Sequence, residues 1–163
     1  MTFTEILAYL GVWSTIGCIA FSLYVIVVFR TGAVFTARKA DGTLKERVPL
    51  SGYLNMAFFL VLIVGFQVIA NIFGIARRGY DISLFFLFLL NYGHYLVLFL
   101  FDTVVIDGLV LAVWRPQFLH LPDAMDGASL KEHILKSLPV GIAAGIVLTA
   151  LSTLLSFWLL FNE

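Results

Sequence analysis

The fold of this chain is decided by residues 82–114, which read ISLFFLFLLNYGHYLVLFLFDTVVIDGLVLAVW. About 20 consecutive apolar residues in a helix already cross a bilayer, and this stretch runs for 33 residues. It also contains His94, Asp102 and Asp107. Ionisable side chains are costly in hydrocarbon, so they usually face a bundle interior, a wet cavity or the membrane interface. The stretch therefore predicts a membrane helix that carries a polar site.

Three further apolar segments accompany it, so the predicted spans are residues 6–29, 51–76, 82–114 and 138–161. Hydrophobic residues make up 61% of the chain and charged residues 12%, whereas soluble domains average about 45–50% and about 25%. A helix satisfies its own backbone hydrogen bonds in hydrocarbon, and these runs are too long for barrel strands. The predicted fold is a single transmembrane domain over residues 1–163: an all-α, up-down bundle of four helices with short loops.

The overall charge and the cysteine content exclude several classes of function. The formal net charge is zero, so no bulk field attracts nucleic acid. The single cysteine, Cys18, excludes an internal disulfide and a zinc site built from cysteines. The first apolar segment lacks a basic leader and is too long for the core of a signal peptide. We expect it to be a retained first span.

The distribution of basic residues predicts the orientation in the membrane. Cytoplasmic loops carry an excess of Lys and Arg, and here the loops 30–50 and 115–137 hold most of them, whereas the connection near residue 79 holds two. This bias predicts a bacterial-type cytoplasmic membrane, both loops in the cytoplasm and both termini outside. The basic residues of the two loops are Arg30, Arg38, Lys39, Lys45, Arg47, Arg115, Lys131 and Lys136, and those of the short connection are Arg77 and Arg78.

The two longer loops contain local structural signals. Asp41–Gly42 is typical of a hairpin turn, which would form either a basic finger that touches anionic lipid or a partner, or a solvated connector. The spacing of Ser129 and Glu132 matches a capping box and predicts a helix that starts at Ser129. Pro139 then falls inside this helix, where proline favours a kink.

Small residues recur at helical spacing in the first and fourth spans. Such residues let helices approach closely in a membrane, so we expect packing surfaces there, against each other or against another chain. Besides the lipid bilayer, the predicted partners are a second copy or other membrane subunits, contacted through the Gly141/Gly145 face or the Gly11/Thr15 face. The recurring residues are Ser137, Gly141, Gly145, Thr149 and Thr153, and Gly11, Thr15, Cys18 and Ser22.

A first candidate site consists of Asn91, His94 and Tyr95 on the third span with Gln67 on the second. The centre of the hairpin between these spans lies near residue 79, so Gln67 and Asn91 should lie at a similar depth, near the middle of the membrane. One interpretation is interhelical hydrogen bonding, worth about 0.6–2 kcal/mol per contact. The other is a ligand or proton site, in which His94 binds haem or a quinone or relays a proton.

A second candidate site lies at the cytoplasmic edge. Asp102 is about 30 Å of helix from Ile82, and Asp107, Arg115 and His120 follow it. These groups could act on a lipid-like substrate, or the two carboxylates could pair with arginines at the rim. On an α-helix a spacing of five turns the two carboxylates about 140° apart, which disfavours a shared metal, and the metal, if any, is unknown.

The sequence leaves three functions open. The leading expectation is a small polytopic inner-membrane protein that serves as a non-catalytic subunit or partner of a membrane complex, because the loops are short and HExxH, GxSxG and phosphate-loop motifs are absent. The alternatives are a membrane enzyme that uses Asp102, Asp107, Arg115 and His120, and a haem-, quinone- or proton-handling protein that uses His94. Whether the protein is an enzyme stays open at this point.

Overall fold

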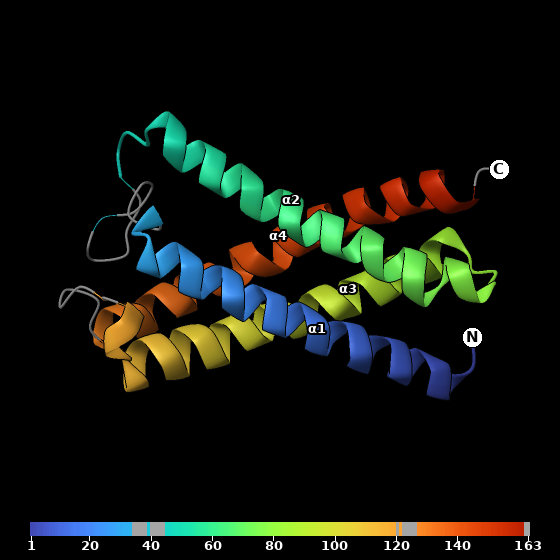
Figure 1. The fold of residues 1–163 in the computed structure, drawn as a ribbon, viewed down its shortest axis with the longest axis horizontal. Coiled ribbons are helices and arrows are strands. Elements are labelled where there is room, and N and C mark those ends of the chain that lie inside the picture. Colours follow the sequence, from blue (N-terminus) through green and yellow to red (C-terminus); the bar gives the residue numbers. More distant parts are fainter. Residues whose placement is uncertain (34–38, 40–44, 120, 122–126, 162–163) are drawn as a thin grey trace. The chain divides into compact units, whose positions relative to one another are not determined.

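A computed structural model describes residues 1–33, 39, 45–119, 121 and 127–161, and it has the predicted all-α architecture of a four-helix membrane bundle (Figure 1). No strand occurs among these residues. The expected hairpin at Asp41–Gly42 lies outside the described residues, as does His120.

The four helices are long and apolar enough to cross a membrane, as the hydropathy of the sequence predicts. Each contains an apolar window with a mean hydropathy between 2.1 and 2.4. A π-helix, η3, continues α3, and short 3-10 turns, η2 and η4, follow α2 and η3. The bounds are α1 Phe3–Arg30, α2 Leu50–Gly74, η2 Ala76–Arg78, α3 Leu84–Phe101, η3 Asp102–Trp114, η4 Gln117–Leu119 and α4 Gly127–Phe161.

Helix α4 differs slightly from the expectation at its start. It begins at Gly127 rather than at Ser129, and it continues through Pro139, which lies inside the helix as predicted. Proline lacks a backbone N–H and cannot make the hydrogen bond expected of a residue in the helix interior.

The π-helix overturns one prediction. Each N–H in a π-helix bonds the carbonyl five residues earlier, and the backbone N–H of Arg115 donates in this way to the carbonyl of Val110 at 2.8 Å. Residues five apart therefore lie almost above one another. Asp102 and Asp107 share nearly the same face of η3, and the expected separation of about 140°, which assumed α-helical geometry, is wrong. The helix also continues through Gly108 without a break.

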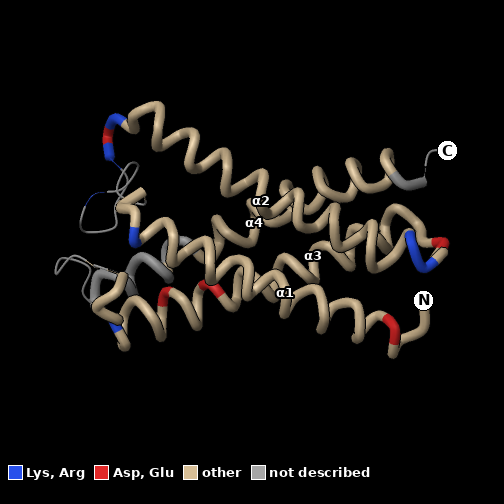
Figure 2. Tube along the Cα trace, viewed as in Figure 1, with Lys and Arg blue, Asp and Glu red and all other residues tan. Residues whose placement is uncertain are grey.

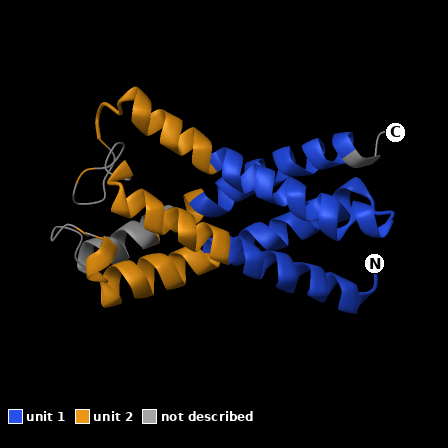
Figure 3. Cartoon of the chain, viewed as in Figure 1, with its two compact units in different colours: residues 1–18, 60–99, 141–163 blue, residues 19–59, 100–140 orange. Residues whose placement is uncertain are grey.

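The chain divides into two compact units, each of which contains part of every long helix (Figure 3). Unit 1 comprises Met1–Cys18, Leu60–Phe99 and Gly141–Glu163, and unit 2 comprises Ile19–Phe59 and Leu100–Val140. The organisation as a single domain stays a prediction.

Unit 2 has an apolar core. Val25 and Phe29 of α1 pack with Ile106 and Leu111 of η3 and with Leu119 of η4. Next to this cluster, aromatic rings of α1 and α2 contact one another, with the centroids of Tyr24 and Phe59 5.6 Å apart. Such packing needs no hydrogen-bond partner, and it fixes where η3 lies within this unit.

Unit 1 contains a close contact between α3 and α4. A Cβ atom on Gly141 would overlap the ring of Phe99, and one on Gly145 would overlap the ring of Tyr95. Both rings belong to a run of near-parallel aromatic side chains along α3, whose successive interplanar angles are 5°, 11° and 7°. The predicted small-residue surface of the fourth span therefore packs against α3 of the same chain. The run consists of Phe88, Tyr92, Tyr95 and Phe99.

The connection between the end of α2 and the start of α3 belongs to unit 1. Gly79 adopts a left-handed conformation, with φ of 70°, which glycine tolerates because it has no Cβ. Next to it, the hydroxyl of Tyr80 donates to a carboxylate oxygen of Glu5 at 2.8 Å. This hydrogen bond raises the pKa of Tyr80 and ties the connection to the start of α1.

Candidate functional site

Unit 1 contains a layer of buried polar side chains, which we call the polar layer. Each member is at most 5% exposed. A polar group buried without a hydrogen bond costs free energy, so the partner of each member decides what the layer can do. The members are Ser14, Gln67, Asn71, Asn91, His94, Thr149, Ser152, Thr153 and Ser156.

Asn71 of α2 connects three helices. Its side-chain oxygen accepts a hydrogen bond from the Tyr9 hydroxyl of α1 at 2.8 Å. Its side-chain nitrogen donates to the Ser156 hydroxyl of α4, also at 2.8 Å. Both ends of the amide are paired, so Asn71 acts as an interhelical connector.

Gln67 and Asn91 are also hydrogen-bonded, which confirms that they lie at a similar depth. The side-chain nitrogen of Gln67 donates to the backbone carbonyl of Asn91 at 3.0 Å, and the Ser152 hydroxyl bonds the side-chain oxygen of Gln67. The side-chain nitrogen of Asn91 donates to the Thr153 hydroxyl at 3.0 Å. These contacts match the interpretation of the sequence as interhelical hydrogen bonding.

Tyr95 belongs to the packing of α3 on α4. Its hydroxyl donates to the backbone carbonyl of Gly141 at 2.8 Å, while its ring lies against Gly145. The hydroxyl of Tyr95 is therefore hydrogen-bonded to α4. Of the four residues predicted to form the first site, Tyr95, Gln67 and Asn91 all contribute to connections between helices.

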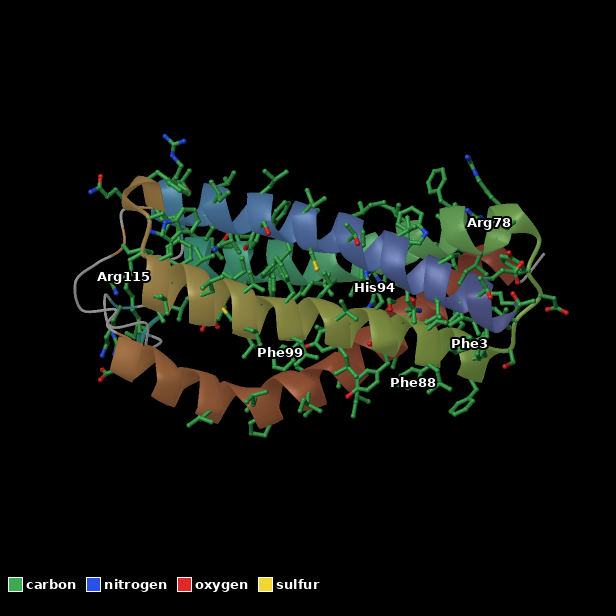
Figure 4. The ribbon with its side chains drawn as sticks, turned by 90° about the horizontal axis from the view of Figure 1, so that it is seen from below. Phe3, Arg78, Phe88, His94, Phe99 and Arg115 are labelled. Atoms are coloured by element: carbon green, nitrogen blue, oxygen red, sulfur yellow. The ribbon has the colours of Figure 1, made fainter. Side chains whose placement is uncertain are left out.

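His94 differs from these neighbours. Its side chain is 0% exposed, yet neither ring nitrogen has a hydrogen-bond partner among the described residues. The backbone of Trp13 interacts with the ring without meeting hydrogen-bond geometry, and the ring centroid of Phe66 is 5.4 Å away. Figure 4 shows His94 on α3 among the side chains of the neighbouring helices.

Gly17 of α1 provides the space for the imidazole. A Cβ atom at this position would lie 3.2 Å from Nε2 of His94 and 3.0 Å from atoms of Phe66 and Leu98. Such distances are tighter than ordinary van der Waals contact. Nε2 therefore faces the backbone of α1 at a closely packed point.

Three other buried polar atoms of the polar layer have no partner among the described residues. They are the hydroxyl oxygens of Ser14 and Thr149 and the side-chain oxygen of Asn91. Most buried side-chain polar atoms in proteins have at least one partner, so unpaired ones demand an explanation such as a bound water or ion, or a catalytic role.

The second predicted site falls in unit 2. Asp102 and Asp107 lie on η3, and Arg115 follows it with a left-handed backbone, φ 46°. All three are half-buried, and each has an interaction partner. Among the described residues, no group of three or more His, Cys, Asp and Glu side chains could hold a metal ion.

Several members of the polar layer were missed by sequence reasoning. Thr149, Ser152, Thr153 and Ser156 recur at spacings of three and four on α4, which is the spacing of one helix face. The small-residue pattern included Thr149 and Thr153 only for their size and did not include Ser152 or Ser156, although the four hydroxyls were an available signal. Ser14 was also missed, although it lies beside Thr15, which the small-residue pattern of the first span included.

Chemically, the polar layer offers one imidazole whose nitrogens have no hydrogen-bond partner within the described part of the chain, set among amides and hydroxyls that mostly bond one another. Such a group can exchange a proton or bind a small polar ligand. No protein-family model, curated protein or solved structure matches this chain.

Proposed function

We propose that this chain is a membrane protein that handles protons at His94. The observation that carries the proposal is a fully buried imidazole whose two nitrogens lack partners within the described part of the chain. An ionisable residue inside a membrane is a functional candidate by default, and histidine is the side chain whose charge changes most readily near neutral pH.

The surroundings support proton exchange over a structural role. A histidine kept only to connect helices would donate or accept at least one hydrogen bond, as Asn71 and Gln67 do in the same layer. Losing such a bond in a buried position costs about 1–3 kcal/mol. An imidazole without a hydrogen-bond partner among the described residues can exchange its proton with a small partner that enters and leaves.

Haem at Nε2 fits this geometry poorly. The Nε2 atom faces Gly17, and even a methyl group added there would lie 3.2 Å from it. The close approach of α1 at Gly17 therefore leaves little room for an iron atom at Nε2. A quinone oxygen at Nε2 would meet the same obstacle, so proton handling is the better supported of the functions proposed for His94.

The test is a titration of His94 in the folded protein. The protein is labelled with ¹⁵N-histidine, reconstituted in lipid vesicles and followed by solid-state NMR from about pH 3.5 to about pH 9, which brackets the ordinary histidine pKa of about 6.5. Of the three labelled histidines, we expect the one whose signal is missing from His94→Gln to change protonation reversibly. The matched control is His120→Gln/His133→Gln, which should keep that signal. A His94 imidazole that keeps one protonation state throughout would contradict the proposal.

As a second candidate function, we propose that the protein is a non-catalytic subunit of a membrane complex. The surface available for contact with a partner is smaller than the sequence predicted. The Gly141/Gly145 face is covered by Phe99 and Tyr95, whereas Gly11 and Thr15 are exposed and a Cβ on Gly11 would meet nothing within 4 Å. A partner would therefore contact Gly11 and Thr15. Cross-linking in native membranes tests this, and a protein that stays monomeric and captures no membrane subunit would contradict it.

The orientation also stays part of the proposal: loops 30–50 and 115–137 in the cytoplasm of a bacterial-type membrane, and both termini outside. It is supported by the positions of the basic residues in the sequence. The enzyme hypothesis for Asp102, Asp107, Arg115 and His120 remains a prediction.

A further inference from the structure

We infer that unit 1 contains a buried hydrated site, in which ordered water bridges His94 to Ser14, Asn91 and Thr149, and that this water is the immediate proton partner of His94. The existence of the water site does not depend on the proposed function. The exchange of protons between this water and His94 rests on the proposed function. Each of these four side chains is at least nine-tenths buried and has a polar atom without a hydrogen-bond partner among the described residues.

The positions of the unpaired atoms on α3 and α4 bring them to one level. Asn91 and His94 are three residues apart on α3 and so share a face. On α4, Thr149 lies one turn after Gly145, which contacts Tyr95, and one turn before Thr153, which bonds Asn91. Thr149 therefore faces α3 between the levels of Asn91 and Tyr95.

Helix α1 brings the remaining hydroxyl to the same region. Ser14 lies between Leu10 and Gly17 at spacings of four and three, so these three residues share a face. A Cβ on Gly93 would meet the Leu10 side chain at 3.8 Å, and Gly17 lies against His94. Ser14 is thus held between two residues that contact α3 beside His94.

The chemistry of the four groups matches water. A buried water makes about three hydrogen bonds to polar groups that otherwise lack partners. Here the Asn91 oxygen accepts, the two hydroxyls donate or accept, and the imidazole offers Nδ1, because Nε2 faces the closely packed backbone at Gly17. The buried polar residues described in unit 1 include no Asp, Glu, Lys or Arg, so a neutral ligand fits better than an ion. The close approach of Gly17 to His94 favours a ligand of small size.

The experiment measures contact between water and His94 directly. Protein with ¹⁵N-histidine is reconstituted in vesicles, and magnetisation transfer from water to the His94 side chain is recorded by solid-state NMR. We expect rapid transfer in the unaltered protein, and several-fold slower transfer in Thr149→Val, which has no hydroxyl to hold the water, and in Ser14→Ala.

A matched control removes a hydroxyl that does not face His94. Thr15 is exposed, and its hydroxyl bonds the carbonyl of Gly11 in its own helix at 2.7 Å, so Thr15→Val should leave the transfer unchanged. A rigid His94 in the unaltered protein that receives no magnetisation from water would overturn the inference, whatever the variants do. So would equal transfer in Thr149→Val and Thr15→Val.

The two proposals fail in different ways when the titration and the transfer are measured on one sample. A His94 that contacts water but keeps one protonation state contradicts proton handling and supports the hydrated site. A His94 that titrates without contact to water contradicts the hydrated site and supports proton handling.

Discussion

Single buried amides provide much of the polar connection within unit 1. Asn71 bonds Tyr9 of α1 and Ser156 of α4, and Gln67 bonds the backbone of α3 and a serine of α4. In a membrane, where burial of apolar surface gives no drive between helices, such bonds add to close packing. Each amide joins parts of the chain that are far apart in sequence.

Replacing Asn71 should therefore destabilise the protein more than replacing an amide with weak contacts. Asn71→Ala leaves the Tyr9 and Ser156 hydroxyls without this partner, and we expect it to lower the free energy of unfolding by about 1–3 kcal/mol. The control is Asn55→Ala, because half-buried Asn55 makes only contacts of 3.5 Å to Tyr24 and Ala33. The measurement is denaturant unfolding in mixed micelles, and equal losses in the two variants would contradict the prediction.

Among the helices, the contact of α3 with α4 shows why glycine is needed on one side. Tyr95 is held by its hydroxyl at the Gly141 carbonyl, so its ring cannot easily move away from Gly145. The small-residue pattern of the sequence predicted a packing surface here, but only the structure identifies the aromatic residues that occupy it.

Gly145→Ala should destabilise the protein, because the added methyl overlaps the Tyr95 ring. Overpacking of this kind costs about 1–3 kcal/mol. Gly11→Ala is the control: its methyl meets nothing within 4 Å, and exchange of glycine for alanine inside a helix stabilises by about 0.5–1 kcal/mol. Thermal unfolding of both variants decides the matter, and a Gly145→Ala protein as stable as Gly11→Ala would refute the overlap.

The π-helix η3 changes which residues of this segment share a helix face. Exposed positions in this part of the helix include Val104, Leu109, Val113 and Trp114, and the spacing of five between the first two is consistent with a wider turn. Nothing in the sequence of residues 102–114 marks a π-helix, because the choice between i→i+4 and i→i+5 hydrogen bonds depends on how the segment packs in unit 2.

Spin labels at Val104→Cys/Leu109→Cys test this geometry in a protein whose Cys18 is replaced by serine. The pair is five apart in η3 and should show strong dipolar broadening, because residues five apart are neighbours there. The control pair, Leu84→Cys/Leu89→Cys, has the same spacing and is exposed on the α-helical part of the same span. It should show weaker broadening, and equal spectra would show that η3 is α-helical in the membrane.

In the whole molecule, the surrounding lipid determines where charged residues are tolerated. In Figure 2 the charged residues described in unit 1 lie near the start of α1 and at the α2–α3 connection, while in unit 2 they include two acidic positions in the α3–η3 run. With four crossings, both termini must lie on one side of the membrane, and the basic loops predict that this side is outside.

Cysteine labelling tests that orientation in intact cells. Asp81→Cys and Glu46→Cys, each in a Cys18→Ser protein, place a thiol at exposed positions of the short connection and of the first loop. Both remove one acidic residue, so they control for each other. A membrane-impermeant maleimide should label Asp81→Cys at once and Glu46→Cys only after the membrane is permeabilised. The opposite pattern would invert the orientation.

The sequence by itself determined that the helices are surrounded by lipid and that there are four of them. It also determined most of the polar face of the third span. Hydropathy over about 20 residues decides these features for each segment separately, and helical spacing placed Gln67, Asn91, His94 and Tyr95 near one another. The tertiary structure alone decided which of these groups are paired, that His94 has no hydrogen-bond partner among the residues it describes, and that Asp102 and Asp107 share a face. These outcomes depend on contacts between distant segments, such as Gly17 with His94 and Thr153 with Asn91. Local periodicity carries no information about such contacts, because a hydrogen bond is decided by the atom that packing brings within reach.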